Sequence, residues 1–153
     1  MLPSEKLKAL KIELPKAPKP VGAYVAFKKV GNIIYISGQL PIDSSGNILK
    51  GKIGSGISLE KGQEAAYLCT INILSQIKEA CDNDIDKVKN CIKITGYVNS
   101  TDEFSDQPKV INAASELIAN VFESGGKHAR AAVSVNSLPL GASVEIDAIF
   151  EIN

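Results

Sequence analysis

The sequence lacks the features that mark nucleic-acid-binding and membrane proteins. Its 153 residues carry 17 basic and 17 acidic side chains, so the formal net charge is zero. A neutral chain has no general electrostatic affinity for nucleic acid or for anionic membranes. No apolar run approaches the roughly 20 residues that a membrane-spanning helix needs. The segment from Met1 to Lys6 also lacks the basic-then-apolar layout of a secretory signal, so we expect a cytoplasmic protein that does not span a membrane.

Cysteine and histidine are scarce as well, which bears on redox and metal chemistry. The three cysteines, Cys69, Cys81 and Cys91, are odd in number and show no CxxC spacing. We therefore interpret them as reduced thiols that pack as small hydrophobic groups. His128 is the only histidine and has no second histidine with which to form a metal site or a triad. We interpret it as a turn residue.

The remaining composition is that of an ordinary globular domain. Hydrophobic residues make up 44% of the chain and charged residues 22%, which at this length allows one domain with a core of its own. Residues 4–14 have the pattern of a short helix, and three prolines follow before residue 21. We therefore interpret residues 1–20 as an N-terminal arm and residues 21–153 as a single domain.

The pattern of apolar residues predicts the element order ββαβαββ. Strand-like segments cover residues 22–30, 33–37, 87–99, 128–136 and 143–150. Apolar residues at helical spacing predict two long helices, one from Ser58 to about Cys81 and one from Ser105 or Asp106 to Gly125. Both helices can cover the same face of one mixed sheet, which makes the fold class α+β. We expect the other face of the sheet to meet another copy of the chain.

The last two predicted strands carry the residues of greatest chemical interest, Arg130 and Glu145. Arg130 is the only arginine in the chain and lies among alanines inside a strand. We predict that the two strands form a hairpin through residues 138–141, in which Asn136 pairs with Ser143. That register places Arg130 and Glu145 on one face but about 13 Å apart, too far for a close salt bridge. A ligand that touched both would need further walls, for which a neighbouring subunit is the natural source.

Four motifs in this order resemble the Rid family, the reactive intermediate deaminases that are also called YjgF-like or L-PSP endoribonuclease-like proteins. They are Lys19–Tyr24, Ile36–Pro41, Val110–Ala113, and Ala129-Arg130 followed by Leu138-Pro139 and Val144–Ala148. The resemblance covers nearly the whole chain from about residue 18 onward, and the arm and the long loop before the first long helix resemble the family's longer branch. It implies a chorismate-mutase-like fold that assembles as a homotrimeric barrel, with ligand sites between subunits.

The resemblance also implies an activity and a set of site residues. Members of this kind hydrolyse reactive enamines and imines, such as 2-aminoacrylate, to 2-oxo acids and ammonia without a metal or an organic cofactor. Arg130 matches the family arginine that binds the substrate carboxylate, and Glu145 matches the glutamate near the attacking water. Other positions that match residues in or near the cleft are Tyr24, Ser37, Gly38 and Asn112. Ala132 stands where many members have a cysteine, which removes a thiol from the pocket and puts substrate preference in question.

Two further functions remain open at this stage. A non-catalytic protein that binds small 2-oxo acids could use the same cleft without turnover. An L-PSP-type endoribonuclease is opposed by the neutral charge, the single arginine and the lack of aromatic side chains placed for base stacking. The residues also have purely structural interpretations, since Arg130 could pair with an acidic residue across an interface and Glu145 could be a solvated strand residue.

Overall fold

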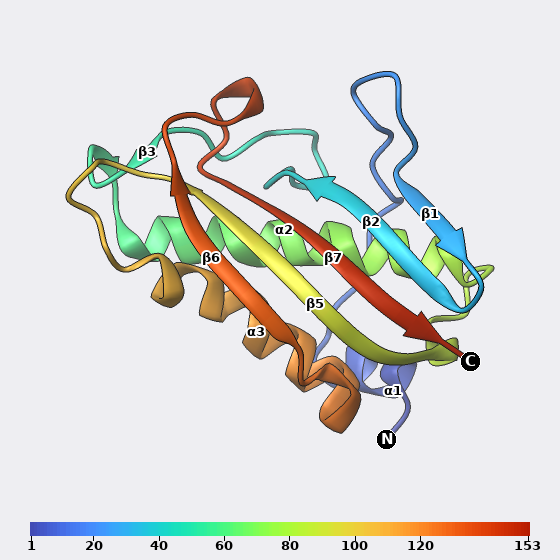
Figure 1. Cartoon of the computed structure of the whole chain (residues 1–153). Helices are drawn as coiled ribbons and strands as arrows, with labels where there is room; N and C mark the ends of the chain where they lie inside the picture. Colours follow the sequence, from blue (N-terminus) through green and yellow to red (C-terminus); the bar gives the residue numbers. More distant parts are fainter.

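The computed structural model covers residues 1–153 and consists of one five-stranded sheet with two long helices against one of its faces (Figure 1). The strands lie in the order β1 (Phe27–Val30), β2 (Ile33–Gln39), β7 (Val144–Ile152), β5 (Val88–Asn99) and β6 (Ala129–Val135). The helices on the covered face are α2 (Leu59–Ala80) and α3 (Gln107–Phe122), and a small separate pair is formed by β3 (Lys52–Ile53) and β4 (Gly56–Ile57). The predicted fold class and the order of the main elements are confirmed.

The two long helices begin and end close to where their sequence signals lie. Ser58 caps α2, because its Oγ accepts a hydrogen bond from the backbone N–H of Lys61 at 3.2 Å. Pro108 stands in the first turn of α3, where its missing N–H costs nothing. A 3₁₀ turn, η2 (Glu123–Gly126), follows α3 and leads the chain into β6. None of the helices combines the length and the apolar content needed to cross a membrane.

The hydrophobic core lies between the sheet and these two helices. Fully buried side chains on the sheet side include Ile34, Ile94, Ile146 and Phe150, and on the helix side Ile73, Ile77, Ile111 and Ile118. The rings of Phe122 and Phe150 meet edge to face with their centroids 5.8 Å apart. Burying one such side chain stabilises the fold by about 1.5–3 kcal/mol, so this face supplies most of the stability of the subunit.

The predicted terminal hairpin is wrong. β6 and β7 do not pair, because β5 lies between them, parallel to β6 and antiparallel to β7. β5 is twelve residues long. Because it lies between two other strands, the backbone groups on both of its edges are hydrogen-bonded. Alternation of polar and apolar residues assigns a strand its two faces but not its neighbour, so the pattern could not distinguish a hairpin from two strands separated by a third.

This change of partner also separates Arg130 from Glu145. Arg130 lies opposite Ile94, whose side chain is fully buried under the helices, so Arg130 is on the helix side of the sheet. Glu145 lies opposite Tyr97, on the open side. The two residues therefore occupy opposite faces of the sheet within one chain, and the prediction that they share a face is wrong.

Smaller differences from the predicted elements arise where strands are irregular or the chain turns. Regular pairing of β1 begins at Phe27 instead of residue 22. A register shift in β5 between Cys91 and Lys93 turns Ile92 outward, where it is 39% exposed. Ser134 bonds to Ser100 and lies opposite the buried Val98, so its side chain is on the helix side of the sheet.

The N-terminal arm packs against the domain through a short helix, α1 (Pro3–Ala9). The predicted helix ends early, because Lys11 adopts a left-handed conformation with φ of 57°. Ser4 anchors α1, since its hydroxyl and its backbone N–H both donate to Asp86, at 2.7 and 2.8 Å. Leu7 is buried against the core, so the arm is held by both polar and apolar contacts.

Candidate functional site

A small cleft of about 60 Å³ brings together three of the predicted site residues, Tyr24, Gly38 and Glu145. Its walls come from residues 18–26, which include the last two prolines of the arm, from the end of β2 and the residues after it, from Pro139 in the turn before β7, and from Glu145 in β7. These segments are far apart in the sequence and meet at one end of the open face of the sheet.

A β-bulge at the end of β2 makes room for Glu145. Ile36 pairs with Ala148 and Gln39 pairs with Ile146, so β2 has one more residue than β7 over this stretch. Gly38 lies in the bulge, and a Cβ at this position would stand only 2.9 Å from Cδ of Glu145. Glycine is therefore needed for the carboxylate to lie this close to the backbone.

The environment of Glu145 is acidic and partly withdrawn from water. Burial raises the pKa of Glu145, and the neighbouring charge of Asp147 raises it further. Burial also raises the pKa of Asp147, against the opposing effect of a hydrogen bond that Tyr97 Oη donates to its Oδ2 at 3.2 Å. A carboxyl group whose pKa is moved toward neutrality is suited to accept and return a proton, which marks this cleft as the candidate for chemistry.

Arg130 lies on the edge strand β6 with its guanidinium against α3. Nη1 donates to Asn112 Oδ1 at 2.8 Å and to Ser115 Oγ at 3.2 Å, and Nη2 donates to the carbonyl of Pro108 at 3.4 Å. Three of its five N–H groups are used in this way, which leaves the Nε–H and one Nη2–H without a partner in the chain. No ion pair of the chain includes Arg130. The helix holds the group while leaving it free to bind an anion.

Ser37 and Asn112 have structural partners in the chain. The Ser37 hydroxyl donates to the carbonyl of Val25 at 2.7 Å and so ties the segment before β1 to β2. Ser37 is not among the residues that line the cleft. Asn112 supports Arg130. Apart from Ser37, the predicted site residues therefore form two groups, one at the cleft and one at the β6 edge, and a single chain does not bring the groups together.

Two further residues, Ser115 and His128, contact the group around Arg130 and were not among the predicted site residues. His128 Nε2 lies 2.9 Å from Ser115 Oγ, and His128 Nδ1 lies 2.6 Å from the carbonyl oxygen of Gly126. His128 was interpreted as a turn residue, and the structure adds a contact from its ring to the group that holds Arg130. The one available hint was that Asn112 and Ser115 are three residues apart and so share a face of α3.

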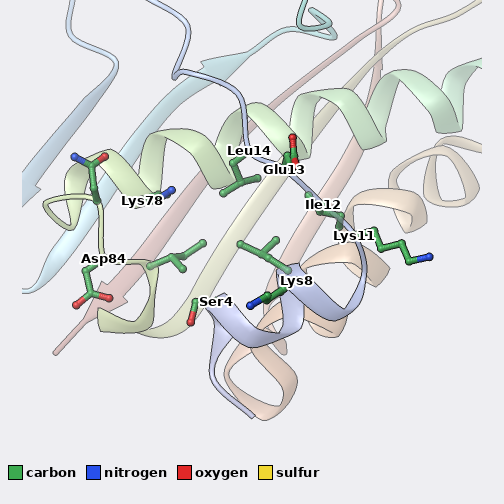
Figure 2. A pocket seen from close by; sticks show the side chains of 11 residues that line it. Ser4, Lys8, Lys11, Ile12, Glu13, Leu14, Lys78 and Asp84 are labelled. Carbon is green, nitrogen blue, oxygen red and sulfur yellow. The ribbon is translucent and has the colours of Figure 1, made fainter.

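A larger cavity of about 840 Å³ lies elsewhere, between the arm and the C-terminal end of α2 (Figure 2). Its lining includes Ser4, Lys8, Leu14, Lys78 and Asp84 and contains none of the predicted site residues. Because the predicted residues Tyr24, Gly38 and Glu145 line the smaller cleft instead, we place the candidate site there. No cluster of three His, Cys, Asp or Glu side chains is arranged to hold a metal ion.

The fold and the site together define a class of protein: an α+β subunit with one sheet face left open, a half-buried carboxylate in a cleft on that face, and an arginine on an edge strand. A model of the family described as "YjgF/chorismate_mutase-like, putative endoribonuclease" matches residues 4–151. The chain belongs to this family, as its motifs predicted.

The relatives cover the chain almost completely. Protein TCP17 from Trypanosoma cruzi is 42% identical over 148 residues, which are 96% of this chain and 92% of TCP17. The crystal structure of the protein Atu1372 from Agrobacterium tumefaciens is similar with a TM-score of 0.90 at 46% identity, over 99% of this chain and 94% of that one. The similarity to Atu1372 thus extends over nearly all of the N-terminal arm.

One relative carries the name of an activity. A 2-iminobutanoate/2-iminopropanoate deaminase from Dermatophagoides farinae is 27% identical over 138 residues, which are 90% of this chain and 92% of that protein. At this identity the fold and the family are shared, but shared fold alone does not assign an activity.

Proposed function

We propose that the protein hydrolyses reactive enamines and imines of the 2-aminoacrylate type to 2-oxo acids and ammonia. The observation that carries the proposal is the guanidinium of Arg130, which α3 holds in place and which keeps two free N–H groups. A planar guanidinium can bind a carboxylate through two parallel hydrogen bonds. Membership of the YjgF family and the named deaminase among its relatives support the same substrate class.

In this proposal Glu145 acts on the attacking water. An enamine first takes a proton from water on its β-carbon and becomes an iminium ion. The oxygen of a second water then bonds to the carbon of the C=N group while Glu145 accepts one proton from that water, and the electrons of the C=N bond move to nitrogen, which gives a neutral carbinolamine. Glu145 returns its proton to the nitrogen as the C–N bond breaks and ammonia leaves, while the hydroxyl group gives its proton to water and becomes the carbonyl of the 2-oxo acid. These steps use a side chain and water alone.

We propose that each complete site lies between two subunits of a homotrimer, since Arg130 and Glu145 are on opposite faces of one sheet. Arg130 of one subunit would then bind the substrate carboxylate and Glu145 of the next would act on the water. Two features of the single chain support this assembly. β6 is an edge strand, so one of its sides has unpaired backbone groups. On the open face, the apolar residues Tyr35 and Val133 are 49% and 44% exposed to solvent.

The activity is tested by generating 2-aminoacrylate from serine with a dehydratase and following its decay in the presence of the pure protein. We expect clear acceleration, with a loss of about 100-fold in kcat/KM for Arg130→Ala because a charged hydrogen-bond pair is removed. Arg130→Lys should retain part of the rate, and Lys127→Ala, which changes an exposed neighbouring charge, should retain all of it. Full activity in Arg130→Ala would contradict the proposal.

Two further measurements distinguish catalysis from simple binding and locate the site. Glu145→Gln should lose turnover while still binding 2-oxobutyrate, whereas a protein that only binds 2-oxo acids would show no acceleration even as the wild type. Mixing Arg130→Ala with Glu145→Gln subunits should restore activity at about a quarter of the sites if the assembly exchanges subunits at random. No recovery after demonstrated exchange would place both residues in the same subunit's site.

A further inference from the structure

The hydrogen bonds around Arg130 continue beyond its guanidinium to the ring of His128. Ser115 Oγ lies 3.2 Å from Arg130 Nη1 and 2.9 Å from His128 Nε2, and His128 Nδ1 lies 2.6 Å from the carbonyl oxygen of Gly126. Ser115, His128 and Arg130 are each partly buried. The contacts form one chain that runs from the backbone after α3, through two side chains, to the only arginine.

The chemistry of the groups fixes the direction of every bond in this chain when His128 is neutral. A carbonyl oxygen only accepts, so Nδ1 of His128 must carry the ring proton. Nε2 is then an acceptor, so the Ser115 hydroxyl donates to it. A guanidinium only donates, so Ser115 Oγ accepts from Nη1 of Arg130. Every donor in the chain therefore faces an acceptor, and hydrogen bonds that all run in the same direction strengthen one another.

We propose that Ser115 and His128 are positioning residues for the carboxylate-binding arginine, an inference that rests on the proposed function. His128 orients the Ser115 hydroxyl so that the lone pairs of Oγ face Arg130. The oxygen then holds one N–H of Nη1, while Asn112 holds the other. With Nη1 held twice and Nη2 held once by Pro108, the guanidinium cannot rotate freely. Its Nε–H and remaining Nη2–H are presented to the substrate in a fixed orientation.

A simpler role for His128 makes a different prediction. The bond from Nδ1 to Gly126 alone could stabilise the turn after α3, with the contact to Ser115 of no consequence. His128→Asn and His128→Gln separate the two roles. An asparagine amide can occupy the place of Nδ1 and keep the bond to Gly126, but it cannot reach Ser115. A glutamine amide can occupy the place of Nε2 and accept from Ser115, but it loses Gly126.

Steady-state kinetics on the assembled protein decide between these roles. We expect KM to rise about tenfold in His128→Asn and in Ser115→Ala with kcat unchanged, because binding of the carboxylate is weakened equally before and during the reaction. His128→Gln and Ser115→Thr should stay within about twofold of the wild type. Ser75→Ala is the matched control, since its hydroxyl bonds only to the carbonyl of Ile71 within α2. A normal KM in His128→Asn together with a raised KM in His128→Gln would overturn the proposal.

A second readout does not depend on activity. Because His128 is the only histidine, ¹⁵N NMR of the imidazole ring reports its tautomer without ambiguity. We expect the Nδ1–H tautomer in the wild type at a pH where the ring is neutral, and a mixture of tautomers in Ser115→Ala. An Nε2–H tautomer in the wild type would overturn the hydrogen-bond chain itself.

The outcomes keep this inference apart from the proposed function. A wild type that neither turns over 2-aminoacrylate nor binds 2-oxobutyrate would contradict the proposed function, and the positioning role would fall with it. Normal turnover in the wild type together with unchanged KM in both His128→Asn and Ser115→Ala would overturn the positioning role alone.

Discussion

The two faces of the sheet differ in how far one chain can bury them. On the face covered by α2 and α3, side chains such as Ile94 and Phe150 are fully removed from solvent. On the open face Tyr35 and Val133 remain about half exposed, and the carboxylate of Glu145 is only partly buried. The first face supplies the stability of the subunit. The second face leaves polar and apolar groups available to a partner, which is why the proposed assembly and chemistry are placed there.

Arg130 departs from this division. Its side chain is on the helix side, yet it lies at the outer edge of the sheet, where α3 covers β6 only in part. There the helix supplies polar partners in place of a hydrophobic wall. In the proposed function, this edge of the covered face and the open face of a second subunit contribute to the same site.

The largest contrast between the faces should appear in stability. Phe150→Ala removes a fully buried ring and its contact with Phe122, and should lower the free energy of unfolding by about 3–5 kcal/mol. Tyr35→Ala, on the open face, should lower it by less than about 1 kcal/mol in the dissociated subunit. Urea denaturation of both variants measures the difference. If both variants lost the same free energy of unfolding when the protein is dilute enough to dissociate, the open face would already be buried within one chain.

Assembly should depend on the open face. Val133→Asp places a charge where we expect another copy to pack, and should raise the dissociation constant of the assembly by about 100-fold, a loss of about 2.7 kcal/mol. Circular dichroism should be unchanged, because Val133 is 44% exposed in the single chain. Sedimentation velocity measures the shift from trimer to monomer. A trimer of undiminished stability would place the interface elsewhere.

A side chain at position 38 should displace the Glu145 carboxylate. Gly38→Ala places a methyl group against the flexible end of Glu145, which can move aside, so it should cost less than about 1 kcal/mol of stability but most of the activity. The double variant Gly38→Ala/Glu145→Ala removes the clash, so it should recover stability without recovering turnover. If the single variant were as stable and active as the wild type, the close approach of the carboxylate would have no role.

The smallest effect should be a dependence of stability on pH. The pKa values of Glu145 and Asp147 are raised in the folded protein, so folding disfavours their ionised forms and they reduce stability above those pKa values. The penalty disappears as the pH falls through the folded pKa values toward the unfolded ones, near about 4. The double variant Glu145→Gln/Asp147→Asn should therefore exceed the wild type in stability most clearly near about pH 7.

Solvent screening should keep that difference below about 1 kcal/mol, because both groups remain partly exposed. Chemical denaturation of both proteins at several pH values gives the difference directly, and subtraction cancels the contributions of the other titrating groups. A difference that stays constant with pH would show that the two carboxyl groups titrate normally.

Much of the architecture could be predicted because it is encoded locally. α2 and α3 follow from apolar residues at helical spacing, the Ser58 cap was visible as a serine before a helical pattern, and the length of β5 followed from its run of strand-forming residues. The motifs predict the candidate site residues, and their roles stay predictions. The bulge at Gly38 and the contact between Ser115 and His128 could not be predicted, since each depends on residues that are distant in the sequence.

By itself, the sequence determined the helices, the strands and which residues alternate on each strand, because those properties depend on near neighbours along the chain. Only the tertiary structure decided which strand lies beside which. That choice minimises exposed edges and buried polar groups over the whole sheet, and no local pattern records it. The insertion of β5 between β6 and β7 is the decisive case, since it puts Arg130 and Glu145 on opposite faces of the sheet.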